Sequence, residues 1–118
     1  MEEAILEKAI EVGKALGKYV RAKENDDLVE YLLGVQNKYH LLDALAHISR
    51  AVYLLKEGTV PGPKPLDREV KAIIELTDTL TENDYSYAEI RGIAGAIATV
   101  AYATATLNSE DNNGGDSQ

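Results

Sequence analysis

Apolar residues recur at spacings of three and four along most of this chain, which is the pattern of amphipathic α-helices. Polar runs, glycines and prolines divide the pattern into separate helices. The expected helices span residues 2–23, a short stretch that begins at Asp27, then 38–56, 66 or 67 to 80, and 86–107. No alternation of apolar and polar residues persists long enough to predict a strand. The sequence therefore predicts an all-α fold, a compact helical bundle of four long helices and one short helix.

Local signals set several of the helix limits. Gly58 is expected to end the third helix, because residues 58–65 contain all three prolines of the chain and form a crossover. Ser86 is followed three residues later by Glu89. A serine and a glutamate at this spacing form a capping box, in which each side chain bonds to the backbone amide of the other residue. The last helix is therefore expected to begin at Ser86.

The helix predicted for residues 86–107 has too little polar surface to stand alone in water. Branched aliphatic side chains lie on one side, whereas small residues lie on another. The small-residue face consists of Gly92, Gly95, Thr99 and Ala103. Small side chains at this spacing allow a second backbone to approach closely. We therefore expect a protein interface at this face, and Gly13 and Gly17 in the first helix indicate another close helix crossing.

Composition limits the organisation of the chain. At 118 residues there is room for one domain, expected over 1–107. Residues 108–118 contain no apolar side chain beyond glycine and include three acidic residues, so they are expected to form a disordered acidic tail. The absence of cysteine excludes disulfides, zinc knuckles and thiol catalysis. Neither a signal peptide nor an apolar run long enough to insert in a membrane is evident, so a cytoplasmic protein without a membrane partner is expected.

The residues of the chain give little indication of a catalytic site. His40, Asp43, His47 and Arg50 project along one side of the third helix at a spacing that could seat a metal. A metal site needs a third and fourth ligand, which this side of the helix does not supply. An ion network among Asp43, His47 and Arg50 explains the same residues. With no nucleophilic triad and no phosphate loop, we expect no enzyme activity, no cofactor, no metal and no small-molecule substrate.

The formal net charge of −8 argues against a free-standing nucleic-acid-binding protein, since phosphate binding requires clustered lysine and arginine. A short basic strip is nevertheless present on the first helix. Its members are Lys14, Lys18 and Arg21, and Lys38 with Arg50 would extend it if the first and third helices are neighbours. Two interpretations stay open: a solvated helix face, or a few phosphate contacts within a larger complex.

The segment 27–55, DLVEYLLGVQNKYHLLDALAHISRAVYLL, resembles the core of the small α-helical subunit of archaeal type I-A CRISPR effector complexes. Residues 84–106 are similar to the last helix of that family. The resemblance implies a non-enzymatic subunit of an antiviral defence complex, present in several copies beside other effector subunits. Such a subunit would bridge the backbone subunits of a crRNA-guided complex and help hold the displaced DNA strand. The alternative is a helical adaptor or regulator that binds another protein and has no nucleic-acid role.

Overall fold

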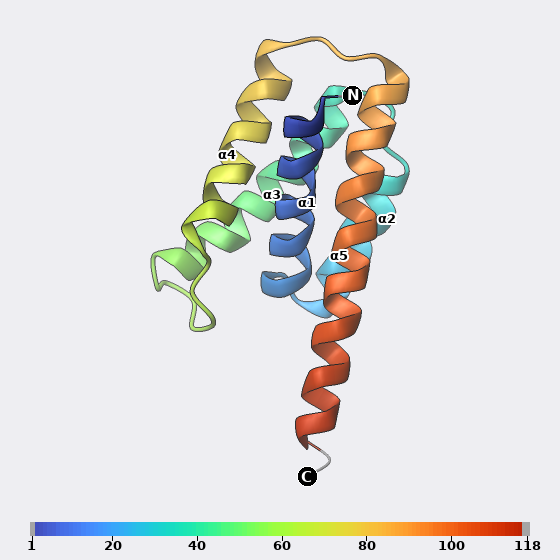
Figure 1. Ribbon diagram of the computed structural model, residues 1–118. Coiled ribbons are helices and arrows are strands. Elements are labelled where there is room, and N and C mark those ends of the chain that lie inside the picture. The colour runs from blue at the N-terminus through green and yellow to red at the C-terminus, as the bar shows by residue number, and fades with distance from the viewer. Residues whose placement is uncertain (1, 117–118) are drawn as a thin grey trace.

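The structure is a computed structural model that describes residues 2–116, with side chains described through residue 107. Its described part contains five α-helices and no strand, which confirms the predicted all-α fold (Figure 1). The helices are α1 (Glu3–Tyr19), α2 (Ala22–Leu33), α3 (Lys38–Lys56), α4 (Asp67–Glu82) and α5 (Tyr87–Asp116). The bounds of α3 agree with the prediction, and those of α4 agree to within two residues.

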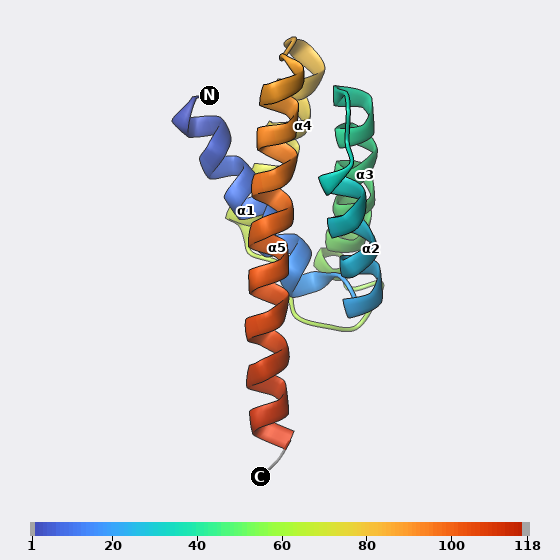
Figure 2. The same cartoon turned by 90° about the vertical axis from the view of Figure 1, so that its right-hand side faces the viewer.

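Helix α1 lies in the middle of the bundle. It packs against α5 on one side and α4 on the other, with α3 and α2 completing the far layer (Figures 1 and 2). Helices α2 and α3 run in opposite directions from the short turn after Gly34, and Figure 1 shows them diverging, with α2 beside α5 and α3 toward α4. In both views α5 runs the full height of the molecule and its lower end extends past the other helices.

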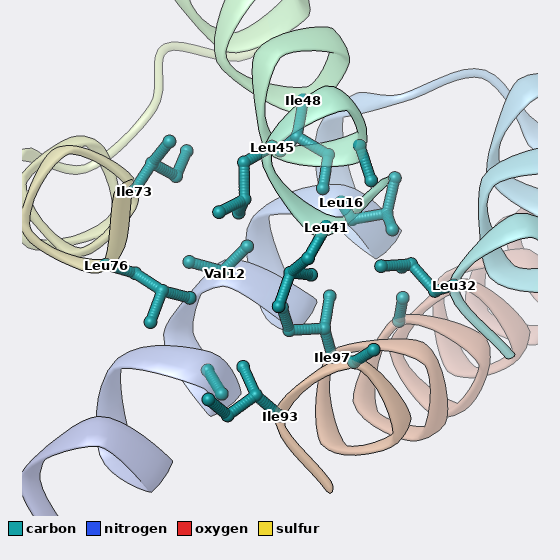
Figure 3. Packing of buried hydrophobic residues seen from close by; sticks show 14 of the residues in the cluster. Val12, Leu16, Leu32, Leu41, Leu45, Ile48, Ile73, Leu76, Ile93 and Ile97 are labelled. Atoms are coloured by element: carbon teal, nitrogen blue, oxygen red, sulfur yellow. The ribbon is translucent and has the colours of Figure 1, made fainter. Parts of the chain in front are cut away.

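One hydrophobic cluster holds all five helices together. Figure 3 shows Val12 and Leu16 of α1 surrounded by side chains from the other four helices. Their neighbours in that view are Leu32 of α2, Leu41, Leu45 and Ile48 of α3, Ile73 and Leu76 of α4, and Ile93 and Ile97 of α5. Each fully buried aliphatic side chain of this kind contributes about 1.5–3 kcal/mol relative to an exposed one. Burial of these side chains is therefore what fixes the relative positions of the helices.

The first helix is shorter than predicted. It ends at Tyr19 instead of continuing to residue 23, because Val20 adopts an extended conformation and places its side chain in the core. Helix α2 then begins at Ala22, and the amide of Asn25 donates to the carbonyl of Arg21. The polar run expected to separate two helices thus forms the first turns of α2, and Asn25 is only 1% exposed.

The start of α5 has the predicted capping box. The Glu89 amide donates to Ser86 Oγ at 3.1 Å, and the Ser86 amide donates to Glu89 Oε1 at 2.9 Å. The helical backbone of α5 is drawn as far as Asp116, whereas the segment 108–118 was predicted as a disordered tail. That segment lies outside the residues whose side chains are described, so its disorder stays a prediction.

One sequence-based expectation about membranes needs correction. Residues Tyr87–Leu107 are long and apolar enough, by length and composition, to cross a membrane. The same helix supplies Ile90, Ile93 and Ile97 to the core of a compact bundle, where each is at most 2% exposed. This packing favours a helix of a soluble protein over a membrane span.

Candidate functional site

Helices α1 and α5 cross at close range, and two glycines of α1 make this possible. A Cβ atom added to Gly13 would lie 2.8 Å from the Ile97 carbonyl oxygen, and one added to Gly17 would lie 2.7 Å from the Ala101 carbonyl oxygen. Real Cβ atoms essentially never come this close to other heavy atoms. The crossing predicted from Gly13 and Gly17 is therefore confirmed, and the backbone of α5 is the surface that they accommodate.

The predicted small-residue interface lies on another face of α5. Gly92, Thr99 and Ala103 are exposed, and Gly95 is partly exposed. A Cβ atom added to Gly95 would meet nothing within 4 Å. No described helix of the same chain covers this face. The structure therefore leaves the predicted interface available to another molecule.

The remainder of that side of α5 is also poorly covered. Tyr102 is 62% exposed and Leu107 is 61% exposed, although both belong to an apolar helix. Only 33% of the residues in the most apolar window of α5 are buried. Contiguous exposed apolar surface of this kind is typical of interaction sites. We call the surface formed by Gly92, Gly95, Thr99, Tyr102 and Ala103 the open face of α5.

Three of the five residues of the predicted basic surface are already paired with carboxylates. Lys14 Nζ lies 3.5 Å from Glu11 Oε1 on the same helix. Lys18 Nζ lies 2.8 Å from Glu69 Oε2, and Lys38 Nζ lies 3.2 Å from Asp84 Oδ1. Each pair reduces the positive potential that these lysines present to a phosphate. Arg21 and Arg50 are exposed and make no ion pair within the described side chains.

The structure does not bring the five basic residues together into one surface. Lys18 contacts Glu69 in the first turn of α4, whereas Lys38 contacts Asp84 just beyond the last turn of α4. These two points are about 20 Å apart along the helix axis at 1.5 Å per residue. Lys38 is thus separated from the strip on α1, and phosphate binding by this set stays a prediction that the geometry weakens.

Glu69 forms a buried polar cluster that the sequence analysis missed. Its side chain is 0% exposed. One carboxylate oxygen accepts from Lys18 Nζ, and the other accepts from the Tyr19 hydroxyl and from the Leu66 amide at 2.9 Å. The cluster ties the end of α1 to the beginning of α4, so it fixes where the 58–65 crossover ends.

The environment of this cluster changes two pKa values. Burial alone would raise the pKa of the Glu69 carboxyl, but the hydrogen bonds from Lys18, Tyr19 and Leu66 outweigh it and lower that pKa below its ordinary value. For Tyr19, burial first, and then the hydrogen bond and negative charge of Glu69, raise the pKa to about 12. Glu69 is therefore held as a carboxylate and Tyr19 as a neutral phenol.

A sequence signal for this cluster does exist. Glu69 precedes Ile73, Leu76 and Leu80 at spacings of four, three and four, so it lies on the apolar face of α4. Asn25 likewise lies on the apolar face of α2, seven residues before the buried Leu32. A polar residue that continues an apolar face is a candidate for burial with a partner. The charged partner of Glu69 comes from another helix, which the sequence alone does not identify, whereas Asn25 Oδ1 has no hydrogen-bond partner among the described residues.

The histidine side of α3 does not form the predicted network. Within the described side chains, Asp43, His47 and Arg50 make no hydrogen bond or ion pair with one another. His40 instead accepts from the Gln36 amide at 3.4 Å. Across the residues that were described, no group of three or more His, Cys, Asp or Glu side chains could hold a metal ion.

Asp43, His47 and Arg50 do share a groove between α2 and α3, whose volume is about 770 Å³. Its lining combines apolar side chains with exposed charged ones and contains no serine, threonine or cysteine that could act as a nucleophile. The molecule thus presents two candidate interaction surfaces, the open face of α5 and this groove. Comparison with protein families, with curated proteins and with solved structures finds no match to the chain.

Proposed function

We propose that this protein is a non-catalytic assembly subunit whose copies associate through the open face of α5. The observation that carries this proposal is the exposure of that face on an otherwise core-forming helix. Gly95 has room for a side chain, and Tyr102 is 62% exposed. Small residues allow the backbone of a neighbouring helix to approach, and the exposed aromatic ring supplies contact area.

The absence of charge on this face allows a second copy as the occupant. The chain carries a formal net charge of −8, so two copies repel each other unless they meet at a surface without carboxylates. Between Arg91 and Leu107 the sequence of α5 contains no charged side chain. The open face is therefore the part of α5 where two copies meet with little repulsion. A two-fold axis there would place the same small residues opposite each other.

We further propose that the assembly is a crRNA-guided CRISPR interference complex in the cytoplasm, in which this chain is the small subunit. This part of the proposal rests on the resemblance of residues 27–55 and 84–106 to that family. Repeated copies that bridge the backbone subunits agree with a self-associating α5. The pairing of Lys14, Lys18 and Lys38 with carboxylates agrees with a role centred on assembly, with few contacts to the displaced DNA strand.

Association through α5 is tested by light scattering on Gly95→Leu. Because a Cβ atom at Gly95 meets nothing within 4 Å and the residue is partly exposed, the variant should keep the unfolding curve of the parent while losing its concentration-dependent association. Ala4→Leu provides the matched control, since Ala4 is exposed on α1 and does not belong to the open face of α5. A parent that is monomeric at all concentrations, or a Gly95→Leu variant that associates like the parent, contradicts the proposal.

The CRISPR assignment needs a separate test. The affinity-tagged chain is isolated from its source cells, and the RNA and proteins that accompany it are sequenced and identified. Recovery of crRNA together with other effector subunits supports the assignment, and its loss in Gly95→Leu but not in Ala4→Leu would connect it to α5. Recovery of protein partners without crRNA would favour the alternative, a helical adaptor with no nucleic-acid role.

The DNA contact is tested with Lys18 left in place, because replacing Lys18 would disturb the buried Glu69. In a reconstituted complex, changing Lys14 and Arg21 together to Gln should reduce the slope of log affinity against log salt by about 2 per copy engaged, if both contact phosphates. An unchanged slope would show that this strip is a solvated helix face.

A further inference from the structure

The groove between α2 and α3 is long enough to hold one helix. On α3 its lining residues are Asp43, Ala46, His47, Arg50, Ala51 and Leu54, which recur at spacings of three and four along one face. On α2 the lining residues Glu24, Asp27, Leu28 and Tyr31 do the same. The span from Asp43 to Leu54 is about 16 Å at 1.5 Å per residue, which matches about three turns of a partner helix.

The floor of this groove is apolar and its rim is acidic. Val20, Leu28, Ala51 and Leu54 are buried or partly buried and supply the floor. Glu24, Asp27 and Asp43 are exposed at the rim, on both helices. Three carboxylates thus face one guanidinium, that of Arg50, and none of the four forms an ion pair within the described side chains.

We infer that this groove binds an amphipathic helix of a partner protein, with apolar residues on one side and lysine or arginine flanking them. Apolar side chains at positions i, i+3 or i+4, and i+7 would fill the floor, which is the usual mode of helix-in-groove recognition. The basic residues would pair with the carboxylates on the two rims, and this complementarity sets the choice of partner. A second copy of the chain is a poor occupant, since it carries a formal net charge of −8 and the rim of the groove is itself acidic.

This inference does not rest on the proposed function. The groove and the open face of α5 share no residue. The protein can therefore bind a basic helix whether or not its copies associate through α5. Gly95→Leu serves as an internal control, because it should remove association and leave helix binding unchanged.

The test uses a fluorescent amphipathic peptide of Leu and Lys, about 14 residues long so that it exceeds three helical turns, and a second peptide with Glu in place of Lys. Binding to the full chain is measured by fluorescence anisotropy at physiological salt. The variant Asp27→Lys/Asp43→Lys replaces one carboxylate on each rim with a positive charge. Its matched control, Asp78→Lys/Glu82→Lys, makes the same change in net charge at exposed positions of α4 outside the groove.

The Lys peptide should bind the parent and the α4 control within about twofold of each other, and it should bind the rim variant at least about tenfold more weakly. Ala46→Trp should also weaken binding, because Ala46 is exposed and the added ring fills the groove without entering the core. Equal losses in the rim variant and the α4 control would show general charge attraction and overturn the inference. So would a Glu peptide that binds the parent as well as the Lys peptide does.

Discussion

The two faces of α5 have different surroundings. On the face toward α1, the β-branched side chains of Val100 and Thr104 and nearby backbone atoms lie so close to Gly13 and Gly17 of α1 that no Cβ atom would fit there. On the open face, Gly95 has at least 4 Å of free space. Packing against the first face thus requires glycine at positions 13 and 17 of α1. Nothing within the chain requires glycine at position 95 on the open face.

This difference shows what a glycine spacing in a sequence can and cannot establish. Gly13 and Gly17 are four residues apart in α1, and Gly92 and Gly95 are three apart in α5, so both pairs indicate a close approach of helices. Only the first pair is explained by a neighbour in the same chain. Glycine in a helix interior costs about 0.5–1 kcal/mol relative to alanine, so the second pair agrees with the contact to another molecule proposed above.

The largest expected effect comes from adding one methyl group at the closed face. Gly17→Ala should lower the free energy of unfolding by about 1–3 kcal/mol, because the added methyl group would meet the Ala101 carbonyl, Thr104 Cβ and the Ala105 amide of α5, and these atoms of a packed helix yield little. Urea unfolding of the parent and the variant gives the difference.

Gly95→Ala is the matched control for that change. Both substitutions gain the same helix propensity, but the methyl group at Gly95 meets no atom, so its unfolding free energy should rise by up to about 1 kcal/mol. If Gly17→Ala and Gly95→Ala change the unfolding free energy by the same amount, the described difference between the two faces is wrong.

The next largest effect is expected at the buried carboxylate that joins α1 to α4. Glu69→Gln should lower the free energy of unfolding by about 2 kcal/mol, since it keeps the shape of the side chain but loses a charge-assisted hydrogen bond from Lys18. Glu75→Gln on the same helix is the control. Glu75 is 39% exposed and pairs with Lys8 and Lys71 at 3.6 and 3.7 Å. Its loss should cost at most about 1 kcal/mol, and equal losses in urea unfolding would contradict the role assigned to burial.

The same cluster predicts how stability varies with pH. The pKa of Glu69 is lower in the folded protein than its ordinary value, so its stabilisation is present above that value and is lost as the pH falls through the folded pKa. The pKa of Tyr19 is raised from 10.0 to about 12, so its stabilisation is present below pH 10.0 and is lost as the pH rises toward about 12. Thermal unfolding across pH should show both losses. Glu69→Gln should flatten the acid side, whereas Tyr19→Phe should flatten the alkaline side.

Much of the fold could be predicted from the sequence because its signals are local. The bounds of α3, the capping box of Ser86 and the crossover after Gly58 depend on residues a few positions apart. The sequence-based predictions were wrong or incomplete where contacts between helices distant in sequence determine the structure. Burial of Val20 ends α1 early, and Glu69 depends on Lys18, which is 51 residues away in sequence. Phosphate binding by the basic residues stays a prediction, because Lys18 and Lys38 pair with carboxylates at opposite ends of α4.

The smallest effect on stability is expected from removing the C-terminal residues that follow the open face of α5. Residues 109–118 carry no apolar side chain other than glycine, so ordering them would cost conformational entropy with no burial to offset it. Truncation after Asn108 should therefore change the free energy of unfolding by less than about 1 kcal/mol and leave association through α5 intact. Urea unfolding and light scattering on the truncated chain measure the two quantities. A larger loss of stability would show that the tail docks on the bundle, and a loss of association alone would extend the interface of α5 past Leu107.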